Sequence, residues 1–181
     1  MADSPRHHSI VDGQVVHRVR ALLFTPAGRI LAIRRTRPGV PVYWTLPGGG
    51  IEPEDPSLEA AAIREVFEET GGRPELHRLV HIDSFADQAH AIFTARIQTW
   101  DETARTGPEF ADPTRGGYDL EELDPTDSRF VDGLVRPRAT ARWLAEHTAA
   151  GTDLFTLPDL RRSGQVKWAP RPPRIDELPT P

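Results

Sequence analysis

Three glutamates, Glu65, Glu68 and Glu69, lie close together near the end of a predicted helix. Residues three and four apart on a helix are surface neighbours, about 5–6 Å apart at their Cβ atoms, so these carboxylates form one acidic patch. The patch is unfavourable by itself, because like charges repel and each acid at the negative end of the helix dipole costs about 0.3–1 kcal/mol. A divalent cation reverses both effects, and magnesium prefers hard oxygen ligands such as these together with water and phosphate oxygens.

Glutamates on a helix are more often a solvated face than a metal site, so the acids alone leave both interpretations open. The flanking residues indicate where this helix begins and ends. Asp55-Pro56 is typical of an N-cap followed by a proline at the first helical position, and Gly71-Gly72 is typical of a C-terminal stop. The apolar face predicted to pack on a sheet consists of Ala62, Ile63, Val66, Phe67 and Thr70.

A glycine-rich turn, Leu46-Pro47-Gly48-Gly49-Gly50, precedes this helix. Glycine adopts conformations that are closed to other residues and has no Cβ to obstruct a ligand. We therefore expect the backbone of Gly49 and Gly50 to come close to a substrate.

The turn, the helix and the segment Arg64-Glu65-Val66-Phe67-Glu68-Glu69-Thr70-Gly71 together resemble the signature of the Nudix hydrolases. The pattern of that family is Gly-x5-Glu-x7-Arg-Glu-apolar-x-Glu-Glu-x-Gly-apolar, and a motif of this length is specific. The similarity runs from Gly49 to Gly72. It implies an α/β fold, a Nudix-like α/β/α sandwich with a mixed central sheet that covers most of the chain.

Two positions depart from the family pattern. Counting from Gly50 places Pro56 at the first glutamate, whereas counting from Gly49 places Asp55 there and leaves one extra residue before Arg64. We favour the second alignment, in which Asp55 replaces the glutamate. The last apolar position of the pattern is occupied by Gly72.

The resemblance also implies roles for single residues. Glu65 and Glu69 would be magnesium ligands, and Glu68 would be a further ligand or the base that accepts a proton from the attacking water. Arg64 would orient a neighbouring glutamate by ion pairing, with an ordinary exposed arginine as the alternative. The implied cofactor is Mg2+, with Mn2+ as a substitute, and the metal would lower the pKa of a bound water.

Several further residues are candidates for the site. Glu109 lies in the long stretch from Asp101 to Gly117, which has no usable periodicity, and it could be an extra ligand or base or simply a solvated acid. Arg34 and Arg35 could hold phosphates through bidentate contacts, and Trp44 could stack on a base. Surface charge is the alternative for the arginines, and core packing is the alternative for Trp44.

The composition fits a compact enzyme that acts on a small molecule. The chain has 181 residues, a net charge of −5 and no cysteine. This charge and the lack of a basic stripe argue against nucleic acid as the partner, and no apolar span reaches membrane length. Residues 1–9 lack the apolar segment of a secretory signal, so we expect a cytoplasmic protein, either a monomer or a homodimer.

Apolar patterning predicts antiparallel pairs of strands around one functional helix. The expected domain is 13–160, after a flexible N-terminus at 1–12 and before a proline-rich tail at 161–181. The predicted strands are Val15–Phe24, Ile30–Arg35, Trp44–Leu46, Leu76–Phe85 and Ala91–Trp100, and a second helix is predicted over Pro137–Ala149.

Two function classes follow from these residues. The first is magnesium-dependent hydrolysis of a diphosphate linkage in a nucleotide or nucleotide-like substrate, that is, a nucleoside diphosphate linked to another group. The second is a non-catalytic module of Nudix-like fold that senses a nucleotide or a sugar phosphate. Such a module would not need every one of the clustered acids.

Overall fold

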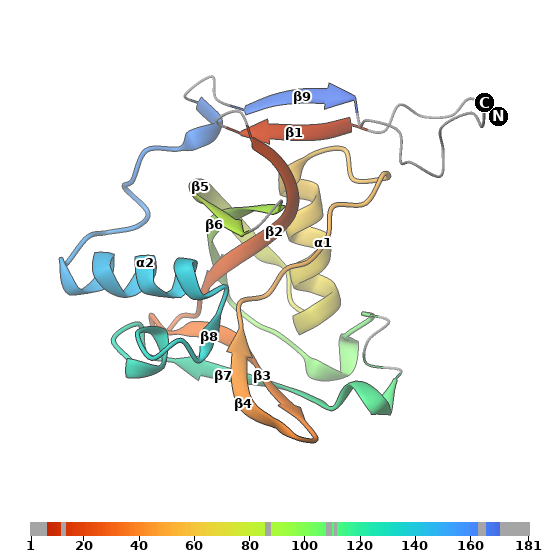
Figure 1. Cartoon of the computed structure of the whole chain (residues 1–181), viewed down its shortest axis with the longest axis vertical. Coiled ribbons are helices and arrows are strands. Elements are labelled where there is room, and N and C mark those ends of the chain that lie inside the picture. Colours follow the sequence, from red (N-terminus) through yellow and green to blue (C-terminus); the bar gives the residue numbers. More distant parts are fainter. Residues whose placement is uncertain are drawn as a thin grey trace.

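The computed structural model describes residues 7–11, 14–85, 88–107, 110, 112–162 and 166–170 (Figure 1). Nine strands and two α-helices make up this part of the chain. The strands are β1 (His7–Val11), β2 (Gln14–Phe24), β3 (Ile30–Arg37), β4 (Val40–Thr45), β5 (Pro74–Phe85), β6 (Gln88–Ile97), β7 (Gly117–Leu123), β8 (Val135–Arg136) and β9 (Val166–Pro170). The helices are α1 (Leu58–Thr70) and α2 (Arg138–Ala149).

The strands form one mixed sheet, as the resemblance implied. Its main path runs β5-β6-β2-β3-β4-β8, with β7 beside β3 and a β1–β9 ribbon beside β2. Strands β2 and β6 are parallel, as are β4 and β8, whereas the other pairs are antiparallel. The pairing of β2 with β3 is confined to Phe24 and Ile30. Away from that corner, the edge of β2 is left to another segment of the chain.

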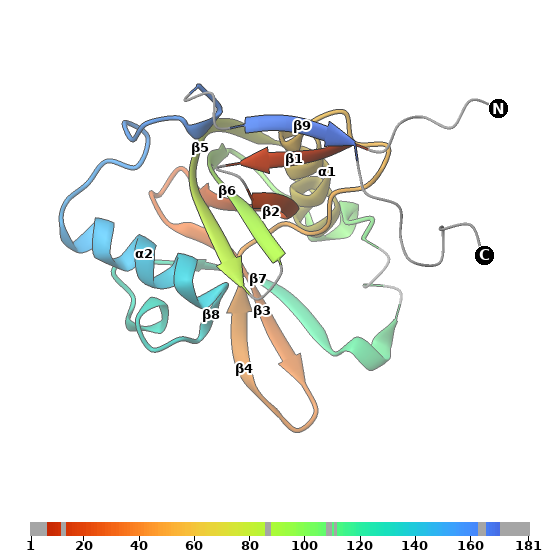
Figure 2. The same cartoon turned by 45° about the horizontal axis from the view of Figure 1, so that its top comes forward.

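The two helices cover opposite faces of the sheet, which confirms the α/β sandwich (Figures 1 and 2). Alternate residues of β2 point to opposite faces. Val19 therefore belongs to a buried cluster with Ala61 of α1, whereas Leu22 belongs to a separate cluster with Leu144 of α2. The first cluster holds α1 against the sheet and thereby fixes the position of its acidic flank.

Helix α1 ends where the sequence predicted but begins later and faces the sheet differently. Gly71 is the C-cap in the left-handed conformation, with φ of 69°. The N-cap is Ser57, whose side chain accepts a hydrogen bond from the Ala60 amide, so the predicted Asp55 cap is wrong. Ile63, predicted to face the sheet, is exposed. The buried stripe consists of Leu58, Ala61, Ala62, Val66 and Thr70.

Four of the described strands were not predicted, one of which is the short β8, parallel to β4. Strand β7 pairs with β3 in the stretch after the long loop, and β1 pairs with β9. Strands β1 and β9 fall within the ranges assigned to the termini, whose boundaries remain predictions. No α-helix in the described part of the chain is long and apolar enough to cross a membrane. The expected cytoplasmic location is therefore still a prediction.

Helix α2 is capped by a strand and not by its own N-cap residue. Pro137 occupies the N-cap position without a side-chain cap bond. Instead, buried Asp83 of β5 accepts hydrogen bonds from the Thr140 amide at 3.1 Å and from its hydroxyl at 2.6 Å. The carboxylate accepts from an amide of the first turn, which has no carbonyl partner within the helix, and it lies at the positive end of the helix dipole. It therefore fixes α2 against the sheet.

Replacing Asp83 with Ala should lower the free energy of unfolding by about 1–3 kcal/mol, because buried donors lose their acceptor. Urea denaturation followed by circular dichroism measures this change. Asp132→Ala, at an exposed aspartate before the same helix, is the matched control and should change stability by less than about 0.5 kcal/mol. Equal stability of the two variants would contradict the capping role.

Candidate active site

The glycine-rich turn occupies the edge of β2 that β3 leaves open. Backbone amides of Ala21 and Val19 donate to the carbonyls of Pro47 and Gly49 at 2.9 and 3.0 Å. The Ile51 amide donates to the carbonyl of His17 at 3.2 Å. These bonds place the turn between β2 and the acidic flank of α1.

Two consecutive glycines of the turn lie too close to other atoms for a side chain to fit without a shift. Gly48 has φ of 135°, and a Cβ there would lie 2.2 Å from the Val19 carbonyl oxygen. A Cβ on Gly49 would lie 2.3–2.5 Å from the carboxylate of Glu65. Nothing lies within 4 Å of a Cβ on Gly50. The turn therefore approaches β2 on one side and the Glu65 carboxylate on the other.

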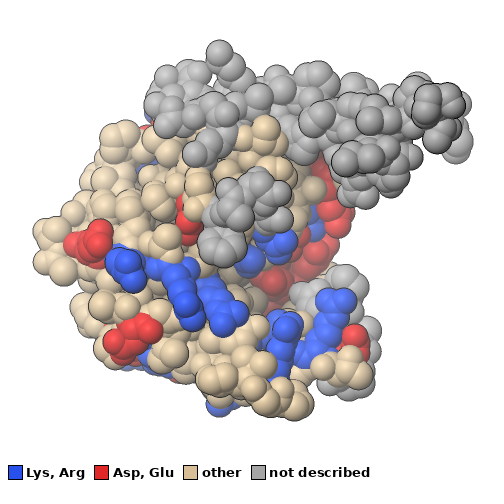
Figure 3. All heavy atoms as spheres, in the orientation of Figure 1, with Lys and Arg blue, Asp and Glu red and all other residues tan. Residues whose placement is uncertain are grey.

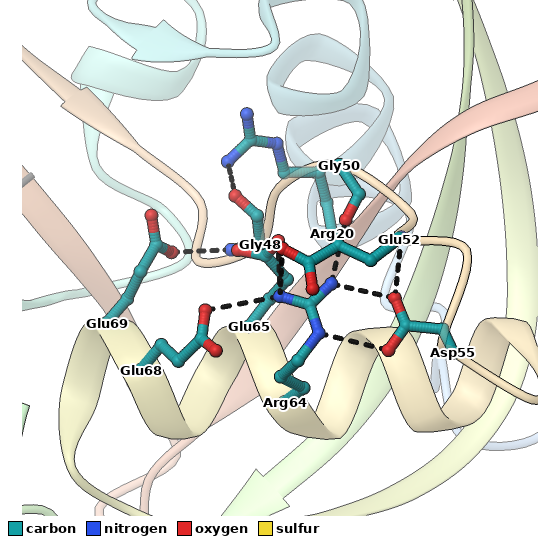
Figure 4. Close-up of polar contacts among 9 residues, drawn as sticks. All are labelled: Arg20, Gly48, Gly50, Glu52, Asp55, Arg64, Glu65, Glu68 and Glu69. Carbon is teal, nitrogen blue, oxygen red and sulfur yellow. Dashed lines mark hydrogen bonds and ion pairs between the residues drawn. The ribbon is translucent and has the colours of Figure 1, made fainter. Parts of the chain in front are cut away.

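Arg64 is the central cation of the acidic flank (Figure 4). Its guanidinium donates to Glu65 at 3.0 Å and to Glu68 at 3.2 Å, and it also binds the Gly50 carbonyl at 2.9 Å. Asp55 accepts two further bonds from it, at 3.0 and 2.8 Å. These contacts raise the pKa of Arg64, mainly through the hydrogen bonds that it donates to Asp55.

Asp55 therefore has a different local role from the one predicted. Its side chain is only 6% exposed and pairs with Arg64 nine residues along the chain. A second contact, from the Glu52 amide at 2.8 Å, holds the turn that precedes α1. The alignment in which Asp55 replaces the first glutamate of the Nudix pattern remains a prediction.

The third glutamate is held by the glycine turn. The Gly48 amide donates to Oε2 of Glu69 at 2.7 Å (Figure 4). The cluster thus joins one flank of α1 to the turn, through an amide at Glu69 and through a guanidinium at Glu65 and Glu68.

A family comparison decides the assignment of this arrangement. The model of the NUDIX domain matches residues 16–138, which include the turn, α1 and seven of the described strands in full or nearly so. The chain belongs to the Nudix family.

Curated relatives match a limited part of this Nudix chain. Diphosphoinositol polyphosphate phosphohydrolase 2 of Mus musculus is 36% identical over 73 residues, covering 37% of this chain and 40% of the relative. The protein of the same name from Rattus norvegicus is 37% identical with the same coverage. The chain therefore spans about two fifths of the length of these relatives.

Solved structures support the fold. A NUDIX hydrolase from Nitrosomonas europaea superimposes with a TM-score of 0.56 at 19% identity, covering 76% of this chain and 90% of that one. An ADP-ribose pyrophosphatase from Streptococcus suis gives a TM-score of 0.52 at 20% identity, covering 75% and 91%. At such identities, these similarities establish the Nudix fold alone.

The Nudix carboxylates have the donor chemistry for a hard divalent cation, but they are not gathered around one point. Among the described residues, no group of three or more His, Cys, Asp or Glu side chains is arranged to hold a metal ion. Glu65 and Glu68 share Arg64 instead, and Glu69 faces the Gly48 amide. Glu65, Glu68 and Glu69 fit Mg2+ by ligand type, so metal binding requires these side chains to exchange partners.

The loop after β6 packs on the C-terminal end of α1. Backbone amides of Thr106 and Gly107 both donate to the Glu68 carbonyl at 3.2 Å, and the Asp101 amide donates to Thr70 at 3.2 Å. The loop thus meets the backbone of a predicted functional residue. Glu109 lies outside the described residues, and its role remains a prediction.

The predicted substrate-binding side chains have other partners in the structure. Arg34 forms an exposed ion pair with Asp119 at 3.4 Å. Arg35 is 7% exposed and lies 3.2 Å above the ring of Tyr118. Trp44 belongs to a buried cluster, and its indole N–H donates to Glu121 at 2.8 Å. These contacts give Arg35 and Trp44 packing roles, and a role in substrate binding is still a prediction for all three.

Arg20 is another arginine that could hold phosphate, but its contact with the glycine turn was not predicted. Its guanidinium donates to the carbonyls of Leu46 and Gly48 in the glycine turn. The signal in the sequence is an arginine inside the apolar run Val19-Arg20-Ala21-Leu22-Leu23, where a buried charge needs partners.

Figure 3 shows basic side chains in a band across one face, and acidic side chains in a recess beside it on the side where Figure 1 shows α1.

Burial controls the protonation of Glu65. Its side chain is 13% exposed, and this desolvation raises its pKa although Arg64 acts in the opposite direction. The native state therefore binds more protons than the unfolded state just above the ordinary glutamate pKa of 4.5. Stability contributed by this group falls as the pH rises through that window.

Glu65→Gln should therefore be more stable than the wild type at pH 7 in EDTA, with a difference that shrinks toward pH 4. Urea denaturation at several pH values measures it. Glu54→Gln, at an exposed glutamate before α1, is the control and should follow the wild-type curve. A Glu65→Gln variant that is less stable than the wild type at pH 7 would refute the stated effect of burial.

Proposed function

We propose that this Nudix chain hydrolyses a diphosphate linkage in a nucleotide or nucleotide-like substrate with the help of Mg2+. The observation that carries the proposal is the partly buried Glu65 carboxylate between Arg64 and the backbone of Gly49, beside Glu68. Holding several carboxylates together at this cost serves little purpose for stability alone, because repulsion and desolvation both oppose it.

Glu65, Glu68 and Glu69 would hold the metal, which neutralises phosphate oxygens and lowers the pKa of a bound water. In the hydrolysis, the oxygen of a water bonds to phosphorus while the bridging P–O bond breaks, and the bridging oxygen leaves on the second phosphate. Glu68 would accept the proton of the attacking water. Arg64 would keep Glu65 ionised and oriented, since its positive charge opposes the effect of burial.

The relatives support the bond type more than the substrate. Their names describe phosphohydrolases of diphosphoinositol polyphosphates, which also contain a diphosphate group. Because the similarity spans about two fifths of those proteins, we propose the diphosphate bond for this chain and leave its organic group to experiment.

A substrate panel tests the proposal. It comprises nucleoside di- and triphosphates, nucleotide sugars, dinucleotides, ADP-ribose and a diphosphoinositol polyphosphate, with phosphate or nucleotide release measured with Mg2+, with Mn2+ and in EDTA. Metal-dependent turnover of at least one member is expected. Binding without turnover would support the alternative of a Nudix-like sensor.

Glu68→Gln should lower kcat by about 10²–10⁴-fold on any substrate found, because a general base contributes an effect of this size. KM should change little. Glu146→Gln, at an exposed glutamate of α2, is the matched control. A near-normal kcat in Glu68→Gln would remove Glu68 from the role of base.

Gly49→Ala should reduce kcat by about tenfold or more while the protein stays folded, because the new methyl group displaces the flexible Glu65 carboxylate and not backbone. Gly50→Ala introduces the same methyl group one residue later into open space and should remain active. Steady-state kinetics and thermal melting of both variants separate these effects. Equal activity of the two variants would show that the Gly49–Glu65 approach is unimportant.

A further inference from the structure

The glycine turn is contacted by an arginine from each side. Arg64 of α1 donates to the Gly50 carbonyl at 2.9 Å. From β2, Nη1 of Arg20 donates to the Leu46 carbonyl at 2.9 Å and also to the Gly48 carbonyl. Figure 4 shows Arg20 beside Gly48, on the other side of the turn from Arg64.

Arg20 bonds the turn where the β2 backbone does not. The β2 amides of Ala21 and Val19 bind the carbonyls of Pro47 and Gly49. The carbonyls of Leu46 and Gly48 alternate with these and are bound by the Arg20 side chain. Successive peptide groups from residue 46 to residue 49 are therefore fixed from β2.

These bonds matter because the turn has little conformational preference of its own. Glycine populates positive and negative φ about equally, so a peptide group beside Gly48 or Gly49 can rotate at low cost. The hydrogen bonds of Arg20 favour one orientation of the peptides on either side of Pro47-Gly48. The Pro47–Gly48 peptide lies between these two; its carbonyl accepts from the Ala21 amide, and its Gly48 amide donates to Glu69 at 2.7 Å.

Arg20 occupies this position at an energetic cost. It lies in an apolar strand, where desolvation lowers its pKa, and the nearby carboxylates of Glu69 and Glu65 oppose that effect. An arginine side chain remains charged in proteins, so its burial must be offset by acceptors. The two turn carbonyls and the acids of α1 supply that compensation.

We propose that Arg20 is a positioning residue, which holds the Leu46–Gly48 segment so that the Gly48 amide orients the Glu69 carboxylate. The value of this orientation for catalysis rests on the proposed function, since Glu69 is one of the predicted metal ligands. The orientation itself does not depend on turnover, and it can be measured without metal or substrate.

The test is NMR of the Gly48 amide in metal-free protein with EDTA, for the wild type, Arg20→Gln and Arg20→Lys. In Arg20→Gln, the Gly48 amide proton should move upfield and exchange with solvent about tenfold faster or more, because its carboxylate acceptor is no longer aligned. Arg20→Lys can still reach a carbonyl and should lie between the two. Arg18→Gln, two residues earlier on β2, removes the same charge and should leave the Gly48 amide unchanged.

Kinetics on the substrate found in the panel give the second readout. Positioning predicts that Arg20→Gln lowers kcat by about tenfold with little change in KM, with partial rescue in Arg20→Lys. A raised KM with an unchanged Gly48 amide would show that Arg20 contacts substrate instead, and it would overturn the proposal.

The two proposals fail in different ways. A wild-type protein with no turnover on any substrate would remove the proposed function and leave the Gly48 measurement intact. An unchanged Gly48 amide in folded Arg20→Gln would overturn the positioning role whatever the activity. If Arg20→Gln does not fold, Arg20→Lys decides, and a Gly48 amide identical to the wild type at partial kcat would overturn it as well.

Discussion

The ion pairs of Arg64 are the interaction on which the site depends. One guanidinium binds Asp55 from the turn before α1, Glu65 and Glu68 from the helix itself, and the Gly50 carbonyl from the glycine turn. Without this cation, the carboxylates of Asp55, Glu65 and Glu68 would lie close together in a partly buried region, where like charges repel more strongly than in water. The positive charge of Arg64 therefore offsets the repulsion between these carboxylates and holds them close together. It also links the turn before α1, the helix and the glycine turn to one another.

A steric constraint complements this electrostatic one. The sheet separates after the corner at Phe24 and Ile30, and the glycine turn fills the open edge of β2. A side chain at Gly48 would meet the backbone of β2, and a side chain at Gly49 would meet the Glu65 carboxylate of α1. The space between β2 and the acidic flank of α1 therefore accommodates glycine at these two positions but no larger residue without a shift.

The sequence predicted the elements that depend on local rules, and it failed where distant contacts decide. The end of α1 at Gly71 followed from the preference of glycine for positive φ, which needs no partner. Its beginning did not, because Asp55 and Ser57 both suit an N-cap, and Arg64 recruits the aspartate for an ion pair. Strand β7 has the sequence Gly-Tyr-Asp-Leu-Glu-Glu-Leu, in which three acids interrupt the apolar pattern of a strand. It forms because it pairs with β3.

The same reasoning applies to the predicted site. The cluster of acids could be inferred because helical spacing alone makes Glu65, Glu68 and Glu69 neighbours, whereas the partner of each depends on the folded turn. Glu68 shows this most clearly, since Arg64 binds its carboxylate and the amides of Thr106 and Gly107 bind its carbonyl. Changes in the loop after β6 can therefore alter Glu68 without touching the Nudix motif. A chain can in this way keep the residues of the motif while the loop, whose sequence follows no periodic pattern, adjusts the position of Glu68.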